Sequence, residues 1–315
     1  NGTIRFNGTI RFFNINLSYI KHMQNITSKN KLGFSLIELS IVILVIGILV
    51  IGITKGSRII KEARIKSAQS LTTGSPVASM SNILMWLEST SEKSFASSEK
   101  VNTALGATGT ISSWNDINPS TATPNNATQV VNANKPRYID NDINGLPSIN
   151  FDGSSDFLGF DGTILAGKSY TVIVVEKRLS SEERGYFISG SGPAQTNQVP
   201  HFGYRTNTTM TFAQHNNNLN VAVSGFASPT PYMHIFIFNS GNGKTYYKNG
   251  VQLINSKTSG ALTPLISYNG AQIAKNPSGG YYNGNIGEII IFSRAIKNSE
   301  RLNIENYLQT KWGIK

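Results

Sequence analysis

An apolar stretch at residues 34–53 decides the architecture of this chain, and it reads FSLIELSIVILVIGILVIGI. It holds a single charge, Glu38. A helix of that length rises about 30 Å, the hydrocarbon thickness of a bilayer. A cleavable secretory signal has a shorter apolar run and then a small-residue cleavage site, whereas here Thr54-Lys55-Gly56-Ser57-Arg58 follows. We therefore expect a membrane-spanning helix.

Glu38 is the unusual residue of this span. A carboxylate inside a membrane segment costs on the order of 3 kcal/mol, so it needs a partner or a function. One interpretation is that Glu38 reaches the headgroup level, because it lies near one end of the span. The other is that it pairs with a cation at membrane depth.

Residues 31–38, KLGFSLIE, resemble the processing motif of type IV prepilins and of the pseudopilins of type II secretion. The resemblance implies that a membrane peptidase cuts after Gly33 and methylates the new N-terminal amine of Phe34. It also implies that Glu38, the fifth mature residue, meets the Phe34 ammonium of a neighbouring subunit during assembly. An opposite charge at short range in low dielectric offsets the burial cost of Glu38.

The segment before the cut fits the same resemblance. Met23 opens an 11-residue basic leader, MQNITSKNKLG, of the length that this family uses. Upstream, NGTIRF occurs at 1–6 and again at 7–12. We expect residues 1–33 to be the leader and residues 1–22 to be non-native or wrongly assigned upstream sequence. Lys55 is a departure, because major pilins usually carry a kink-forming proline at that place.

The helix is expected to continue beyond the span. Basic residues alternate with apolar or small ones at three- and four-residue steps up to about Thr73, where Gly74-Ser75-Pro76 ends the pattern. We therefore assign residues 34–75 to one long transmembrane and amphipathic helix. Residues 76–315 are assigned to a separate domain.

This second domain consists of short β-branched and aromatic runs between Gly, Asn and Pro turns, the pattern of a sandwich or barrel. Asn249-Gly250 and Asp152-Gly153 are two-residue turn signals. Gly241-Asn242-Gly243-Lys244-Thr245 imitates the end of a phosphate loop but is interpreted as a hairpin turn. The expected strands are 83–88, 148–151, 170–176, 186–189, 201–205, 210–214, 232–238, 245–248 and 288–292.

One helix is expected near the end of the chain, from about Asn298 to Trp312. Asn298 or Ser299 is expected to cap it. Its buried side is expected to hold Leu302, Tyr307 and Leu308. The fold class is therefore α+β and mainly β: a long N-terminal helix, an antiparallel sandwich and a short C-terminal helix.

The order of several motifs in the domain resembles the concanavalin-A-like, laminin-G-like jelly rolls of bacterial surface proteins. Members of that family often bind glycans, some of them with calcium, and a fold alone does not supply a function. We expect Trp86, Trp114 and Trp312, which lie inside these motifs, to pack in the core. The motifs are LMWLE at 84–88, SWND at 113–116, NGLPSINFDG at 144–153, YTVIVV at 170–175, YKNG at 247–250, GEIIIFSR at 287–294 and IENYLQTKWG at 304–313.

Enzymatic chemistry is not expected. Retaining glycosidases need two carboxylates about 5–5.5 Å apart, yet the strand expected at 170–176 carries only Glu176. The chain has no cysteine, which excludes thiol catalysis and cysteine-ligated metals. His234 lies in a strongly apolar strand and is interpreted as a hydrogen-bonded core residue.

Calcium is the only cofactor that the sequence leaves open. Residues 140–145, DNDING, match the first half of a calcium loop, but the twelfth position is Phe151 instead of Glu. A turn-forming cluster and a loop calcium site that uses Asp140, Asp142 or Asp152 are both compatible with this pattern.

The net charge of +11 belongs to the N-terminal part of the chain. Ten of the 28 Lys and Arg residues, but only two of the 17 acids, lie within residues 1–66. Positive charge beside a membrane segment is the simpler explanation, because a nucleic-acid groove needs a basic face on a folded domain. We expect no nucleic-acid partner.

Together these features predict a pilin-like or pseudopilin-like subunit. As a precursor it is expected in the bacterial inner membrane, with the C-terminal domain periplasmic or extracellular. Its partners are expected to be the prepilin peptidase/methyltransferase, the membrane, other subunits of a type IV pilus or type II secretion pseudopilus, and glycans bound by the lectin-like domain. The alternative is a single-pass, membrane-anchored glycan-binding surface protein that does not assemble.

Overall fold

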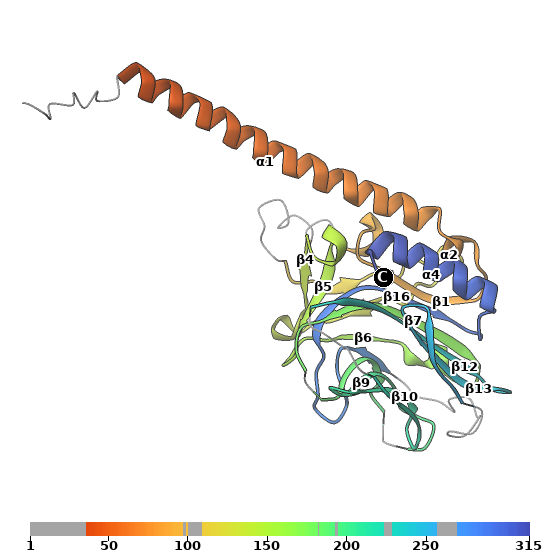
Figure 1. The fold of residues 1–315 in the computed structure, drawn as a ribbon. Helices are drawn as coiled ribbons and strands as arrows, with labels where there is room; N and C mark the ends of the chain where they lie inside the picture. Colours follow the sequence, from red (N-terminus) through yellow and green to blue (C-terminus); the bar gives the residue numbers. More distant parts are fainter. Residues whose placement is uncertain are drawn as a thin grey trace, which may run out of the picture. The chain divides into compact units, whose positions relative to one another are not determined.

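The computed structural model describes residues 36–96, 99, 109–181, 183–192, 195–223, 229–256 and 270–315 (Figure 1). By its internal contacts the chain divides into two compact units, Asn1–Gly56 and Ser57–Lys315. The described part of the first unit is the beginning of a long helix. The second unit contains the rest of that helix and every strand described below.

The long helix, α1, covers Leu36–Thr73 and ends where the sequence predicts. The Gly74 N–H still donates to the Ser70 carbonyl at 3.0 Å, and the chain then turns. Ser75 caps the short helix α2, Pro76–Ser79, by accepting the Ala78 N–H at 3.3 Å. Pro76 suits this first position, because its missing N–H would have no intrahelical partner.

One antiparallel sheet, sheet A, lies in the middle of the second unit (Figure 1). Its strand order is β14-β13-β12-β7-β16-β5-β4, and β1 also pairs with β16. The strands are β1 (Ile83–Glu88), β4 (Arg137–Ile139), β5 (Ser148–Asp152), β7 (Tyr170–Arg178), β12 (Pro231–Asn239), β13 (Gly243–Lys248), β14 (Val251–Ser256) and β16 (Asn283–Phe292).

A second antiparallel sheet, sheet B, has the order β11-β10-β9-β8-β15-β6-β3-β2. Its strands are β2 (Ser113–Trp114), β3 (Ala127–Thr128), β6 (Leu158–Phe160), β8 (Gly185–Gly190), β9 (Pro200–Thr206), β10 (Thr209–Gln214), β11 (Asn217–Ala222) and β15 (Ala271–Ile273). Short 3₁₀ helices lie at Glu92–Ser94, Asn132–Asn134, Ile143–Gly145 and Gly162–Leu165. The nine expected strands are all present, and most extend one or two residues beyond their predicted ends.

Sheet B, sheet A and the helices form three layers, and a hydrophobic core lies between each neighbouring pair. The larger lies between the sheets and includes Trp114, Phe202 and Tyr204. The smaller lies between sheet A and the helices, and includes Trp86 and Trp312. Central strands of sheet A are therefore buried on both faces, which explains their unbroken apolar runs. All three tryptophans are buried, as predicted.

The C-terminal helix α4, Asn298–Trp312, covers the outer face of sheet A with the predicted bounds (Figure 1). The predicted cap is wrong, because the N-cap is Lys297, whose N–H donates to the Glu300 carboxylate at 2.7 Å. Leu302 is half exposed instead of buried. Tyr307 and Leu308 are buried as expected, so the buried face of α4 contains these two residues but not Leu302.

The turns show one further correction. Asn249-Gly250 joins β13 to β14 with both residues at positive φ, 49° and 80°, as a two-residue hairpin turn requires. Residues 240–242 connect β12 to β13, and Gly243 begins β13, so the predicted hairpin at this motif is present. Asp152-Gly153 is not a hairpin turn, because β5 belongs to sheet A and the next strand, β6, to sheet B.

Candidate functional site

The predicted processing site lies outside the described residues, since Gly33 and Phe34 precede the first of them, Leu36. Glu38 lies in the first turn of α1 and is exposed on the helix surface. A carboxylate in the first turn interacts favourably with the positive end of the helix dipole. This interaction offsets only part of the cost of placing the charge of Glu38 in a membrane.

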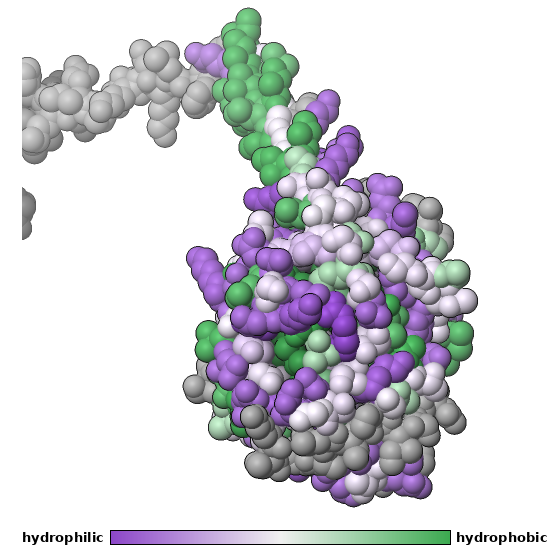
Figure 2. All heavy atoms as spheres, turned by 90° about the vertical axis from the view of Figure 1, so that its right-hand side faces the viewer, coloured by the Kyte–Doolittle hydropathy of each residue, from purple (hydrophilic) through white to green (hydrophobic). Residues whose placement is uncertain are grey.

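The first part of α1 carries an apolar surface on all sides. It is long and apolar enough to cross a membrane, and none of its most apolar stretch is buried within the chain. Figure 2 shows these hydrophobic side chains gathered on the helix, whereas the surface of the sandwich is mixed and largely hydrophilic. Such a surface needs lipid or other apolar helices around it. The exposed large residues are Leu36, Ile37, Leu39, Ile41, Val42, Ile43, Leu44, Val45, Ile46, Ile48, Leu49, Val50 and Ile53.

The second part of α1 packs on the sandwich within the same compact unit. Ala68 is buried in the smaller core. The Gln69 side-chain amide donates to the Thr90 carbonyl at 2.9 Å, and the Lys61 ammonium forms an ion pair with Asp140. Apolar, polar and ionic contacts therefore join this half of the helix to the strands and loops of the domain.

A buried ionic cluster strengthens the junction. The Lys311 ammonium donates to the Thr72 hydroxyl at 2.8 Å, to Glu288 Oε2 at 3.0 Å and to Glu88 Oε1 at 2.5 Å. All four side chains are buried. A buried charge is tolerated when an opposite charge and hydrogen bonds compensate it. Here the cluster connects four separate elements: α1, β1, β16 and α4.

Glu288 is the centre of this cluster. Its carboxylate also accepts the indole N–H groups of Trp86 at 2.7 Å and Trp312 at 2.9 Å. Burial raises the pKa of Glu288; the Lys311 ammonium opposes this and the Glu88 carboxylate adds to it. The two tryptophans are thus oriented by one carboxylate, which fixes how α4 lies on sheet A.

The candidate calcium ligands Asp140 and Asp142 are each held by a lysine. Asp140 pairs with Lys61, and Asp142 pairs with Lys177. The Asp142 carboxylate also accepts the Ser148 hydroxyl at 2.6 Å. A calcium ion at these carboxylates would have to displace ammonium groups that already neutralise them.

The third candidate, Asp152, closes its own loop. Its carboxylate accepts the backbone N–H groups of Ser154 at 2.8 Å, Ser155 at 2.8 Å and Asp156 at 3.0 Å. Burial alone would raise the pKa of Asp152, but these hydrogen bonds lower it well below its usual range. Among the described residues no group of three or more His, Asp or Glu is arranged to hold a metal ion. Calcium at these residues stays a prediction.

Glu176, the carboxylate of the predicted strand, is enclosed between the sheets. It accepts the Tyr204 hydroxyl at 2.7 Å and the Tyr282 hydroxyl, and His234 Nε2 lies 2.8 Å from it. Nδ1 of His234 lies 2.9 Å from the Tyr246 hydroxyl. Burial lowers the pKa of His234, although Glu176 favours its protonated form. The interpretation of His234 as a hydrogen-bonded core residue is confirmed.

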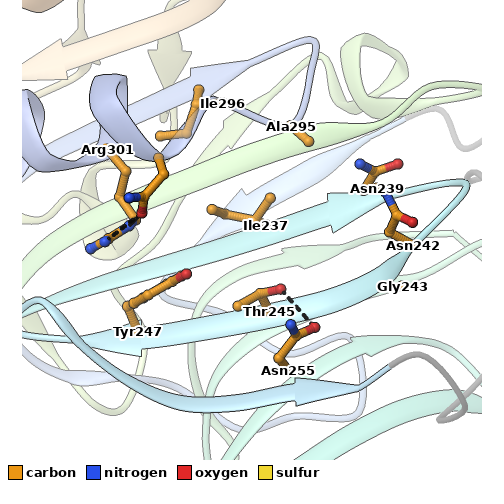
Figure 3. Close-up of a pocket in the computed structure, with 11 residues that line it drawn as sticks. Ile237, Asn239, Asn242, Gly243, Thr245, Tyr247, Asn255, Ala295, Ile296 and Arg301 are labelled. Atoms are coloured by element: carbon orange, nitrogen blue, oxygen red, sulfur yellow. Dashed lines mark hydrogen bonds between the residues drawn. The ribbon is translucent and has the colours of Figure 1, made fainter.

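A groove of about 390 Å³ lies where β12, β13 and β14 meet the beginning of α4 (Figure 3). The Thr245 hydroxyl and the Asn255 side chain are 3.3 Å apart across two neighbouring strands. The Arg301 guanidinium lies 4.1 Å from the centre of the Tyr247 ring and pairs with Glu305. The lining residues are Ile237, Asn239, Asn242, Gly243, Thr245, Tyr247, Asn255, Ala295, Ile296, Asn298 and Arg301.

Most polar groups in this groove are neutral amides and hydroxyls, which can both donate to and accept from sugar hydroxyls. The sequence reasoning did not find it, because its residues come from two segments, 237–255 and 295–301, that no local pattern connects. The one available signal was the density of asparagine in the first segment.

The N-terminal segment is similar to a known sequence family. Residues 28–54 match the prokaryotic N-terminal methylation motif. The matched range contains Gly33, Phe34 and Glu38, so the predicted cut and the predicted assembly residue both lie inside the methylation motif. No curated protein gives a sequence match to the chain.

Solved structures resemble the sandwich at low sequence identity. A GH54 α-L-arabinofuranosidase is 10% identical with a TM-score of 0.53; the match covers 75% of this chain and 60% of that one. Trypanosoma rangeli sialidase is 11% identical with a TM-score of 0.49; the match covers 79% of this chain and 38% of that one. Domain 4 of an extracellular arabinanase from Geobacillus stearothermophilus is 14% identical with a TM-score of 0.44, covering 55% and 80%.

These likenesses concern the fold. This chain spans 60% of the length of the arabinofuranosidase. The architecture behind the methylation motif is accordingly a jelly-roll-like β-sandwich, as the sequence predicts. Activity does not follow from a shared fold.

Proposed function

We propose that the chain is a pilin-like subunit that displays a lectin-like sandwich. The prepilin peptidase cuts between Gly33 and Phe34 and methylates the Phe34 amine. The mature helix then packs with helices of other subunits, and Glu38 pairs with the Phe34 ammonium of a neighbour. The observation that carries this proposal is the methylation motif at residues 28–54, which leads directly into the exposed apolar helix.

The attachment of α1 to the sandwich supports the same proposal. A simple anchor needs only a flexible linker between the membrane helix and the domain. Here the helix runs on to Thr73 without a break, and the buried Lys311 cluster holds Thr72. A filament subunit needs a helix that is firmly attached to its domain, and within the second unit the contacts of Thr72, Gln69 and Lys61 with the sandwich provide this attachment.

The filament is proposed to be a type IV pilus or the pseudopilus of type II secretion. We propose that the precursor lies in the bacterial inner membrane, with the sandwich periplasmic or extracellular. Its partners are the prepilin peptidase/methyltransferase and other pilin or pseudopilin subunits. The sandwich serves adhesion or another binding role.

We further propose that the sandwich binds glycans and does not hydrolyse them. The neutral polar groove at the end of β12, β13 and β14 supports binding. The enclosure of Glu176 by Tyr204, Tyr282 and His234 supports a non-catalytic role, since a general acid or base must reach its substrate. The proteins with similar folds include glycosidases, and one of those structures contains arabinotriose.

The second candidate function is a single-pass, membrane-anchored glycan-binding protein that does not assemble. The exposed apolar surface of α1 favours it as well, because lipid alone can cover that surface. The two candidates differ in what they require of Glu38, which only an assembling subunit needs.

Intact-mass and N-terminal peptide mass spectrometry of the protein from its native membrane tests the proposal. A mature chain that begins with N-methylated Phe34 supports processing and the pilin pathway. A chain that keeps the leader from Met23 supports the plain anchor. Binding of the full chain to a glycan array, with and without calcium, tests the role of the sandwich independently of processing.

A further inference from the structure

A second cavity, which we call the basic pocket, lies on sheet B and has a volume of about 410 Å³. Six side chains give it its character: Arg184, Tyr186, His201, Arg205, His215 and Asn218. Cavities of 300 to 1,000 Å³ are typical of small-ligand sites. Its chemistry differs from that of the neutral groove beside α4.

The basic pocket is on the outer face of sheet B, away from the core. Successive side chains of a strand point to opposite faces. Phe202 and Tyr204 of β9 belong to the core between the sheets. His201 and Arg205, one position before and one after them, therefore point to the opposite face, where the pocket opens.

The two arginines are brought together by the backbone. The Arg184 N–H donates to the Arg205 carbonyl at 3.0 Å, so the two residues lie side by side on adjacent chain segments. Arg184 has a φ of +60°, a left-handed conformation that is uncommon for a residue other than glycine. Strained backbone of this kind often accompanies a functional position.

None of the described residues neutralises the positive charge of the basic pocket. No Asp or Glu is found among the described residues that line it. Arg184 and Arg205 form no ion pair with any residue that the structure describes. Burial raises the pKa of Tyr186, and the nearby Arg205 and Arg184 guanidinium groups oppose this rise.

An aromatic pair lines the floor of the basic pocket. The rings of Tyr186 and His201 stack with centres 5.3 Å apart and planes within 9° of parallel. This stacked pair forms a flat floor for the basic pocket.

We propose that the basic pocket binds the anionic group of an acidic sugar, a carboxylate or a sulfate ester. Arg184 and Arg205 hold the anion, because guanidinium groups bind planar oxyanions through paired hydrogen bonds. The Asn218 amide contacts the hydroxyl groups. The sugar part of this inference rests on the proposed glycan-binding function, whereas the anion part rests on the pocket alone.

The test uses the full chain in detergent micelles and isothermal titration with matched probes. D-Galacturonic acid and D-galactose differ only in the oxidation of one carbon, and galactose 6-sulfate and N-acetylneuraminic acid provide other anions. We expect at least one acidic sugar to bind, with galactose about tenfold weaker or worse. Raised salt should weaken acidic-sugar binding if the arginines provide it.

Variants locate the binding site. R184Q/R205Q should reduce acidic-sugar affinity about tenfold or more. R137Q, which removes an exposed arginine on sheet A, should leave it unchanged. Thermal unfolding of each variant verifies that the fold is kept, as expected for exposed side chains.

Several outcomes would overturn the proposal. These are equal binding of galactose, full affinity in R184Q/R205Q, binding of inorganic sulfate as tight as that of the acidic sugar, or no binding of any acidic sugar. Binding of neutral glycans alone would overturn the basic pocket but leave the glycan-binding function standing. Failure to find mature Phe34 would overturn processing and leave the basic pocket untouched.

Discussion

Lys311 and Glu288 form an ion pair with 3.0 Å between Nζ and Oε2, and neither side chain is more than 1% exposed. Lys311 also neutralises Glu88, so removing it leaves two buried carboxylates without a cation. We expect Lys311→Met to lower the free energy of unfolding by about 3–5 kcal/mol. Urea unfolding of the full chain in detergent, followed by tryptophan fluorescence, measures this. Lys66→Met, at an exposed position of α1, is the control and should change little.

Gly287 allows Trp312 to pack on sheet A. A Cβ at position 287 would lie 2.8 Å from Trp312 Cη2, closer than real side chains approach. We expect Gly287→Ala to destabilise the chain by about 1–3 kcal/mol, because the indole would have to move away from Glu288. The matched control is Gly159→Ala in β6, where the nearest atom is 3.8 Å away. Equal unfolding midpoints for the two variants would contradict this account.

The local sequence pattern was sufficient to predict most of this fold. β7 and β16 are continuous apolar runs, and the residues on either side of α4 mark where that helix begins and ends. These three elements could therefore be located from the sequence alone. β2 and β3 have two residues each and give no periodic signal. β11 alternates strictly between buried and exposed positions, but asparagine is uncommon in strands, so its sequence does not indicate one.

The sites were less predictable than the strands. Gly33, Phe34 and Glu38 are adjacent in sequence, so a motif could identify them. Lysine side chains are usually exposed to solvent. Nothing in the sequence around Lys311 indicates that Glu88 and Glu288 enclose its ammonium group. The two pockets are likewise assembled by strand pairing between distant segments, which no spacing rule predicts.

His201 should make stability depend on pH. Burial lowers its pKa to about 4, with Arg205, His215 and Lys244 adding to the effect while the Pro200 carbonyl opposes it. The unfolded chain binds a proton at about pH 6.5, and the folded chain does so only near pH 4. The unfolded state thus holds more protons in that window, so stability is lost as the pH falls from 6.5 to 4.

His201→Gln removes this contribution. We expect the variant to lose less stability than the wild type between pH 6.5 and 4, by about 3 kcal/mol. Urea unfolding at pH 7 and pH 4.5 measures the difference, and the value at pH 7 accounts for any change in packing. Parallel pH profiles for the two proteins would show that His201 titrates normally in the folded state.

Calcium binding at the aspartates has a direct test. Lys61 and Lys177 form ion pairs with Asp140 and Asp142, and backbone N–H groups donate hydrogen bonds to the Asp152 carboxylate. We therefore expect millimolar calcium to leave the melting temperature unchanged relative to EDTA. A concentration-dependent rise, abolished in Asp142→Asn, would instead establish a calcium site that displaces Lys177.

A substitution of Glu38 distinguishes the two proposed functions, the assembling subunit and the membrane anchor that does not assemble. If its carboxylate pairs with the Phe34 ammonium of a neighbour in low dielectric, Glu38→Gln leaves that ammonium without a counter-charge. Breaking such a pair costs about 3 kcal/mol or more, which corresponds to roughly a hundredfold loss of incorporation into filaments. Membrane insertion should not suffer, because a neutral side chain crosses the bilayer more easily.

The measurement compares the protein in sheared filaments with the protein in the membrane fraction. Glu62→Gln is the matched control, since Glu62 lies on the same helix, is exposed and pairs only locally with Arg58 at 3.3 Å among its described contacts. Loss of filament incorporation in Glu38→Gln but not in Glu62→Gln supports assembly through the methylated amine. Equal incorporation of both variants would mean that α1 anchors the sandwich without pairing Glu38, and the function would then reside in the sandwich.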